Sequence, residues 1–184
     1  MTDVPRPPPN PRMLARMAEE RLESRHFEAI GRVAVSWAFF EAEIDAACIN
    51  LAEVEDERGV CLASQIAGSA RKLDAYLSLA RLHSLPQDLN KRLNKLYEDA
   101  RQHAEKRNRI VHDPWLFDHP NPPFRYEATA RKTLKLQRVP MTTESVLSFV
   151  EDIRTLRSTF MILEEEVLLA WKSSQGKSSS STHL

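Results

Sequence analysis

The hexapeptide RNRIVH, residues 107–112, combines three side chains that could act together on a phosphodiester. Arg107 is a permanent cation suited to binding phosphate, and His112 is the residue type that exchanges a proton near neutral pH. Asn108 lies four residues before His112, so on a helix the two share a face and Asn108 could orient the imidazole. An arginine and a histidine of this kind are the minimum equipment for RNA cleavage without a metal ion.

The spacing of Arg107 and His112 raises a geometric difficulty. Five residues correspond to about 140° around an ideal helix. The two side chains are therefore expected to converge only if the helix frays or tightens near Val111, or if a second copy of the chain completes the site. Asp113 and Pro114 favour such a distortion, because proline disfavours the helical conformation in the residue before it. The alternative is structural, since cations near a helix C-terminus interact favourably with its dipole and its last carbonyls.

The helix that carries this motif is predicted over about 87–111. Its apolar stripe begins with leucines and ends with polar side chains, in the order Leu89, Leu93, Leu96, Ala100, His103, Arg107 and Ile110. A charged residue also interrupts the stripe of the first long helix, predicted over about 25–54, where Glu41 lies between Trp37 and Ile44. An unpaired buried charge is costly. We therefore expect Glu41 and Arg107 to lie close together, within one bundle or across a dimer contact, with Glu41 and His103 as supporting residues of the site.

The remaining segments complete an all-α fold. Helices are predicted over about 60–81 and 142–171, with a shorter one from about residue 12, and each long helix has one apolar face to bury. Residues 114–141 are first Pro-rich and then alternate, which indicates a short β-hairpin or an ordered loop. The sequence thus predicts a four-to-five-helix bundle over 12–172 with this insertion before the last helix. Pro-rich residues 1–11 and Ser-rich residues 173–184 are expected to be disordered tails.

The charges balance over the whole chain, with 26 Lys and Arg against 26 Asp and Glu. Nevertheless, residues 91–109 contain seven basic and three acidic side chains, and residues 125–138 contain five basic and one acidic. A basic side around the motif could hold RNA, with Arg109, Lys106, Arg131 and Lys132 as candidate contacts, and with acidic Glu164–Glu166 elsewhere. The alternative is an ordinary solvated face. Among the aromatic residues after the motif, Trp115 is expected to pack the loop onto the bundle, whereas Phe117, Phe124 and Tyr126 could pack or could stack on bases.

Composition excludes several other classes of function. Cys48 and Cys61 have no CxxC spacing, so they are expected to be reduced thiols rather than a zinc or redox site, and no metal site or cofactor is expected. No apolar run is long enough to cross a membrane, and the N-terminus lacks the apolar core of a signal peptide. A cytoplasmic protein is therefore expected.

The motif and its setting resemble the HEPN-domain family, whose members carry the pattern R-x(4–6)-H, commonly as R-N-x-x-x-H. The resemblance covers about residues 25–171 and rests mainly on RNRIVH at the end of the third long helix, with WAFFE, residues 37–41, similar to the first helix of bacterial members. It implies a ribonuclease of a toxin–antitoxin or defence system, acting as a homodimer in which two motifs line one cleft. Arg107 would then stabilise the scissile phosphate, His112 would act as general base or acid, and Asn108 would orient the site.

Two other functions remain open from the sequence. The first is a HEPN-like module that has no catalytic activity and binds an antitoxin or another partner protein. The second is a helical-bundle interaction protein in which RNRIVH only caps a helix.

Overall fold

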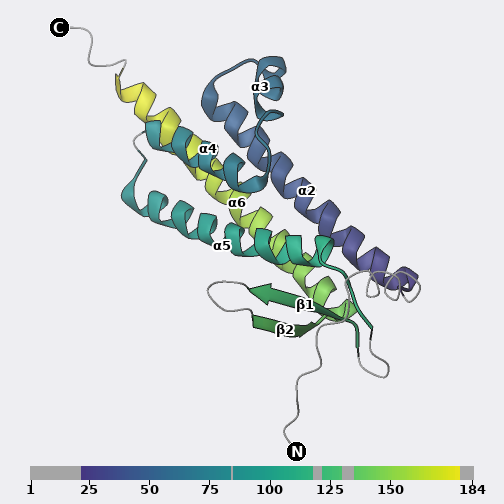
Figure 1. Ribbon diagram of the computed structural model, residues 1–184. Helices are drawn as coiled ribbons and strands as arrows, with labels where there is room; N and C mark the ends of the chain where they lie inside the picture. Colours follow the sequence, from purple (N-terminus) through teal and green to yellow (C-terminus); the bar gives the residue numbers. More distant parts are fainter. Residues whose placement is uncertain (1–21, 84, 118–121, 130–134, 179–184) are drawn as a thin grey trace, which may run out of the picture.

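The computed structural model describes residues 22–83, 85–117, 122–129 and 135–178. Within these ranges lie α2 (Ser24–Ala52), α3 (Asp56–Ala63), α4 (Ser69–Leu82), α5 (Gln87–His112) and α6 (Thr143–Ser178). Two strands, β1 (Phe124–Thr129) and β2 (Lys135–Pro140), pair antiparallel between α5 and α6, with Phe124 opposite Pro140. The predicted helical bundle with a hairpin before its last helix is confirmed (Figure 1).

The long helices α2 and α6 run side by side in the same direction. Arg157 of α6 contacts Glu43 of α2, and seven residues later Asn50 donates a hydrogen bond to Glu164 over 3.3 Å. Helix α5 runs in the opposite direction along α6. Arg92, near the start of α5, pairs with Glu166 near the end of α6, and Lys106, near the end of α5, lies beside Asp152 near the start of α6. Consequently the end of α5, the start of α2 and the hairpin lie together at one end of the bundle (Figure 1).

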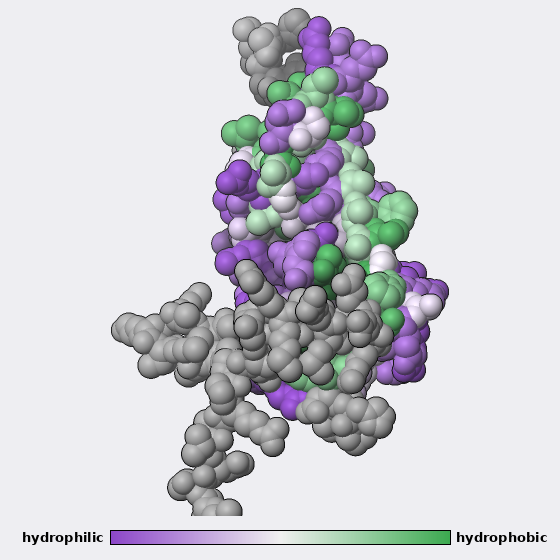
Figure 2. All heavy atoms as spheres, turned by 45° about the vertical axis from the view of Figure 1, so that its right-hand side comes forward, coloured by the Kyte–Doolittle hydropathy of each residue, from purple (hydrophilic) through white to green (hydrophobic). Residues whose placement is uncertain are grey.

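Aromatic and branched side chains from four helices form the core. Phe160 of α6 packs edge-on against Phe40 of α2, with 5.8 Å between ring centroids, and lies tilted against Tyr76 of α4 at 5.1 Å. The largest fully buried side chains are Val33, Trp37, Phe40, Ile44, Tyr76, Leu93, Val146, Phe149, Ile153, Phe160 and Val167. The 3.6-residue periodicity of the sequence predicts the buried face of α6 correctly, from Val146 to Val167. On the first helix it also predicts Phe27 as a core residue, and there it is wrong, because Phe27 is 55% exposed. Hydrophobic groups also reach the surface between hydrophilic ones on the side that Figure 2 shows.

The helix predicted over 60–81 is two helices, so this prediction is wrong. Helix α3 ends at Ala63, and the chain turns before α4 begins after Gly68. Gly68 has φ of 84°, a conformation that is open mainly to glycine. At Gly59 of α3, an added Cβ would come within 2.6 Å of Ile49 Cγ2, so the missing side chain allows α3 to approach α2.

The last helix is longer than predicted and overlaps the supposed disordered tail. It begins as expected after Thr142, whose hydroxyl oxygen accepts a hydrogen bond from the Ser145 amide over 3.1 Å. It continues to Ser178, and the hydroxyls of Ser173 and Ser174 donate to carbonyls of the preceding turn. The tail expected over 1–11 and the short helix from residue 12 lie outside the described residues, as do residues 179–184. None of the described helices is both long and apolar enough to cross a membrane.

The hydroxyl of Tyr76 is buried, and it has no hydrogen-bond partner in the described part of the chain. Burial raises the pKa of Tyr76 well above its usual value. We expect Tyr76→Phe to raise the free energy of unfolding by about 1 kcal/mol, because a buried unpaired hydroxyl is costly and the ring is retained. Tyr97→Phe is the matched control: the Tyr97 hydroxyl bonds to Asp74, so the same change should destabilise the protein. Urea unfolding of both variants measures the difference. A loss of stability in Tyr76→Phe would contradict the expectation.

The two thiols differ in their surroundings. Cys48 is buried, whereas Cys61 on α3 is exposed. Burial, with a smaller contribution from Asp45, raises the pKa of the Cys48 thiol to about 11. Because the thiolate is the reactive form, a thiol reagent at pH 8 should modify Cys61 rapidly in the native protein and Cys48 only after denaturation. Two equally fast thiols in the native protein would contradict this, and Cys61→Ser provides the control.

Candidate active site at the end of helix α5

Arg107 and His112 lie in contact within a single chain. Arg107 Nη1 donates a hydrogen bond to Asn108 Oδ1 over 2.9 Å and lies 3.3 Å from His112 Nε2. Helix α5 continues unbroken to His112 and ends at Asp113, which has the extended backbone expected before Pro114. The expectation that convergence requires a frayed helix or a second copy is therefore wrong. The arginine side chain is long enough to cover the angular separation.

Asn108 contacts Arg107, so its predicted role as the residue that orients His112 is not supported. Its amide oxygen accepts the Nη1 hydrogen bond and so helps to fix the guanidinium beside the imidazole. An arginine can only donate hydrogen bonds, so a hydrogen bond to His112 requires an unprotonated Nε2.

The motif lies on a part of α5 that α4 does not cover. Helix α4 packs along the first half of α5, where Asp74 bonds to Tyr97 and Arg81 donates to Asn94. Asn108 follows Tyr97 by eleven residues, which places it on nearly the same side of the helix, about 20° away. Since α4 begins only at Ser69, it does not cover this side of α5 near the end of the helix. Asn108 and His112 are accordingly exposed, and Arg107 is half-buried.

Glu41 binds Trp37 instead of Arg107. The indole Nε1 of Trp37 donates to Glu41 Oε1 over 3.1 Å, and no ion pair joins Glu41 to Arg107 among the residues described. Trp37 is only 2% exposed, and a buried indole N–H requires an acceptor. This requirement explains the carboxylate on the apolar stripe, and the direct pair predicted between Glu41 and Arg107 is absent within one chain. The Nε of Arg107 is buried and has no partner in the described ranges.

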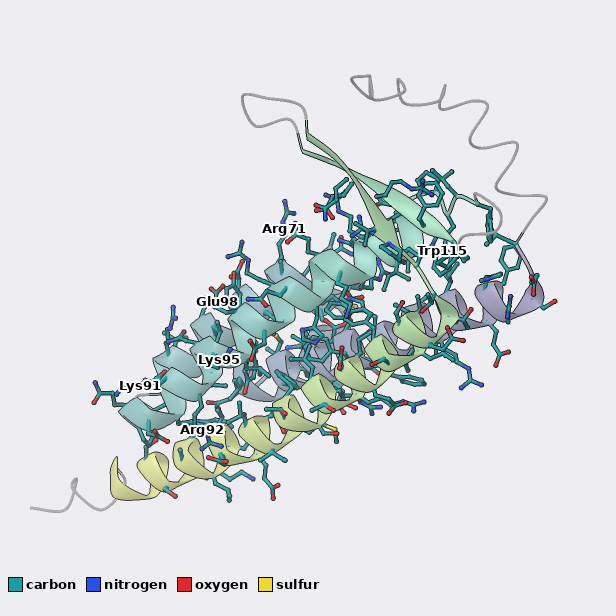
Figure 3. The ribbon with its side chains drawn as sticks, turned by 90° about the horizontal axis from the view of Figure 1, so that it is seen from below. Arg71, Lys91, Arg92, Lys95, Glu98 and Trp115 are labelled. Carbon is teal, nitrogen blue, oxygen red and sulfur yellow. The ribbon has the colours of Figure 1, made fainter. Side chains whose placement is uncertain are left out.

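His103 belongs to a different surface, the groove between α5 and α6. Its ring stacks on Phe149 at 5.6 Å, and its Nδ1 lies 2.7 Å from the carbonyl oxygen of Asp99. The groove has a volume of about 820 Å³, and Lys91 and Lys95 lie at its other end. Figure 3 shows these lysines near the start of α5, far along the helix from Trp115. His103 therefore contacts α6 rather than the motif.

The basic residues proposed to contact RNA have partners in the chain or lie outside the described part. Lys106 Nζ lies 4.2 Å above the Phe149 ring and 3.6 Å from Asp152, and Arg109 pairs with Asp113 over 3.6 Å. Both pairs remain partly exposed, so both cations can still attract a polyanion. Arg131 and Lys132 fall outside the described residues.

The hairpin is anchored to the end of α5 by contacts that the sequence analysis missed. Arg125 of β1 is nearly buried, and it pairs with Asp113 over 3.3 Å and with Glu127 over 3.2 Å. Trp115 is 4% exposed, and its indole donates to the Ile110 carbonyl over 3.0 Å. Its predicted packing role is confirmed, and Phe124 is also buried. The side chain of Tyr126 lies outside the description.

His26 is a second residue that the sequence analysis missed. It is buried near the start of α2, and its ring lies edge-on to both Trp115 and Phe117. Its Nδ1 accepts a hydrogen bond from the Glu23 amide. His26 therefore caps the start of α2 and packs against the loop that follows the motif. In the described ranges, no group of three or more His, Cys, Asp or Glu side chains could hold a metal ion.

No protein-family model, no curated protein and no solved structure matches this chain significantly.

Proposed function

We propose that this chain is a metal-independent endoribonuclease of the HEPN type. The observation that supports this most directly is the contact of 3.3 Å between Arg107 Nη1 and His112 Nε2 on an open helix end. It places a phosphate-binding cation and a proton-transfer group within reach of one phosphodiester. The motif pattern R-N-x-x-x-H supplies the second reason.

The proposed reaction uses the RNA's own 2′-hydroxyl as nucleophile. His112 Nε2 accepts the proton of this hydroxyl while the 2′-oxygen attacks the adjacent phosphorus. The bond from phosphorus to the 5′-oxygen of the next nucleotide breaks, which leaves a 2′,3′-cyclic phosphate and a 5′-hydroxyl after that oxygen is protonated. Arg107 offsets the negative charge that develops on the phosphoryl oxygens. Asn108 acts as a positioning residue that holds Nη1.

A homodimer would supply two such pairs and a second histidine to protonate the leaving oxygen. The open side of α5 beyond the start of α4 leaves space for RNA or for another chain beside the motif. In the full proposal the protein acts on cytoplasmic RNA as a toxin or defence protein, and an antitoxin or similar partner protein restrains it.

The second candidate function is a HEPN-like module that binds a partner without catalysis. One observation favours it: the guanidinium of Arg107 already contacts both Asn108 Oδ1 and His112 Nε2 within the chain, without any ligand. In this case the cluster stabilises the end of α5 and presents a polar surface to a partner protein.

RNA cleavage by the purified protein in EDTA distinguishes the two candidates. If the protein is such a nuclease, wild type should give cleavage products with 2′,3′-cyclic phosphate ends, and His112→Ala and Arg107→Ala should each give far less of them. Absence of cleavage over a broad set of RNAs, with all three proteins folded, would favour the binding module. Cleavage that survives both substitutions would exclude this motif as the active site.

A further inference from the structure

The last turn of α5 lacks one of the hydrogen bonds that normally close a helix. The carbonyl of Ile110 would ordinarily accept a hydrogen bond from the amide four residues later, but that residue is Pro114, which has no N–H. The indole of Trp115 donates to this carbonyl instead, over 3.0 Å. The turn that carries His112 is therefore held partly by groups outside the helix, at a place where helices tend to fray.

Asp113, the residue after His112, places a negative charge at the end of the same turn. The C-terminal end of a helix itself carries a partial negative charge, so a half-buried carboxylate there is unfavourable unless a cation lies beside it. Among the residues described, Arg125 Nη1 lies 3.3 Å from Asp113 Oδ2, and Arg109 Nη1 lies 3.6 Å from the same oxygen. Arg125 is nearer and less exposed, so it contributes more to offsetting this charge.

The hairpin holds Arg125 in this position. Glu127 lies two residues later on the same face of β1 and pairs with Arg125 Nη2 over 3.2 Å. Leu116 and Phe124 exchange two backbone hydrogen bonds of 2.7 and 2.9 Å, which join the start of β1 to the segment after α5. Figure 1 shows the two strands beside the end of α5. Arg125 thus connects a strand that is fixed to the chain after α5 with the charge at the end of this helix.

We propose that Arg125 is a positioning residue, which holds the last turn of α5 through Asp113 and so keeps His112 beside Arg107. This role rests on the proposed nuclease function, in which the two side chains act on one phosphate. Arg107 lies more than one turn inside the helix, whereas His112 is its last residue. The contact of 3.3 Å between Nη1 and Nε2 joins these two places, so unwinding of the last turn separates them.

Loss of the Arg125 cation should lower the rate of the chemical step. In Arg125→Gln, kcat for RNA cleavage should fall by about 10-fold to 100-fold, because a displacement of about 1 Å can cost this much. KM should change much less, since Arg107 still binds the phosphate. Arg125→Lys keeps a cation opposite Asp113 and should lose less of kcat. Arg101→Gln removes a cation from the middle of α5 without touching the last turn, and should leave kcat unchanged.

A comparison in a second background tests whether Arg125 acts through Asp113. In Asp113→Asn the charge at the end of the helix is absent, so adding Arg125→Gln should lower kcat further by less than about twofold. Glu127 loses its partner in both backgrounds, but it is exposed enough for water to solvate its carboxylate. An equal fall of kcat in the two backgrounds would overturn the proposed link to Asp113.

Amide hydrogen exchange followed by NMR measures the same restraint without RNA. Arg125→Gln should speed exchange by about tenfold or more at the amides of Val111–Asp113, and should leave the Leu96 amide in the middle of α5 unchanged. The Leu116 amide should stay protected, which establishes that the hairpin is still attached. Unchanged exchange in the last turn would overturn the proposal, as would faster exchange with an unaltered kcat.

The two kinds of measurement separate this role from the proposed function. If wild type cleaves no RNA in the assay described above, the proposed function fails, and the exchange rates alone then decide whether Arg125 restrains the last turn. If wild type cleaves RNA and Arg125→Gln cleaves it with the same kcat, the nuclease stands and the positioning role fails. Circular dichroism establishes that each variant is folded.

Discussion

His112→Ala is expected to lower the rate of RNA cleavage by about 100-fold to 10,000-fold, the usual contribution of a general acid–base group. Arg107→Ala should lower it by about 100-fold to 1,000-fold, since it removes charge stabilisation of the transition state. Both effects should appear in kcat more than in KM, because both groups act on the reacting phosphate. Neither variant should unfold, since the His112 side chain is exposed and Arg107 lies at the end of α5.

Arg101→Ala is the matched control for Arg107→Ala. Arg101 lies on the same helix, is exposed, and pairs weakly with Glu98 at 3.8 Å. Arg101→Ala removes the same positive charge without touching the motif. The rate of cleavage should therefore stay close to that of wild type, and RNA should bind only slightly more weakly, because one cation fewer attracts the phosphates. Arg107→Lys should recover little, because lysine cannot contact Asn108 and His112 from one planar group. If Arg101→Ala and Arg107→Ala lower the cleavage rate equally, Arg107 acts only through its positive charge and not through its position beside His112.

Phe160→Ala is expected to lower the free energy of unfolding by about 3–5 kcal/mol, because it opens a cavity at the centre of the bundle. Phe160 is 1% exposed and contacts aromatic rings of both α2 and α4. A loss of this size is a large part of the stability of an ordinary domain. The variant should therefore unfold at a much lower urea concentration than wild type, with an unchanged slope of the transition.

Leu169→Ala provides the comparison for Phe160→Ala. Leu169 lies on the same helix but is 60% exposed, so its truncation should change the free energy of unfolding by less than about 0.5 kcal/mol. A similar loss in the two variants would mean that the centre of the core lies elsewhere than described.

The sequence predicted the bundle well because each long helix repeats apolar residues with a period that matches the helix. The helix predicted over 60–81 was the exception, because apolar residues recur with the helical period on both sides of Gly68 and so hid the break there. Periodicity does not detect a single residue with positive φ. The end of α6 was missed for a related reason. Serines suggest a tail by composition, yet Ser173 and Ser174 bond to the helix carbonyls behind them.

The candidate site was predicted in its members but only partly in its contacts. Arg107 and His112 do meet, although positions on a helical wheel place them far apart, because a wheel ignores the length of an arginine side chain. Glu41 was assigned to Arg107 because opposite charges attract. In the structure Glu41 instead accepts the hydrogen bond that the buried indole of Trp37 must make, one turn away on the same helix. The link between Arg125 and Asp113 joins a strand to a helix end, and no local pattern predicts such a contact.

The position of Trp115 gives the protein an intrinsic optical reporter. Its indole is hydrogen-bonded to the carbonyl of Ile110, within the last turn of the helix that carries His112. The other tryptophans lie elsewhere: Trp37 is bonded to Glu41 in the core, and Trp171 packs against His83 at the far end of the bundle. With those two replaced by phenylalanine, the remaining emission would follow the last turn of α5 alone. Occupation of the motif could then be observed in real time without a label.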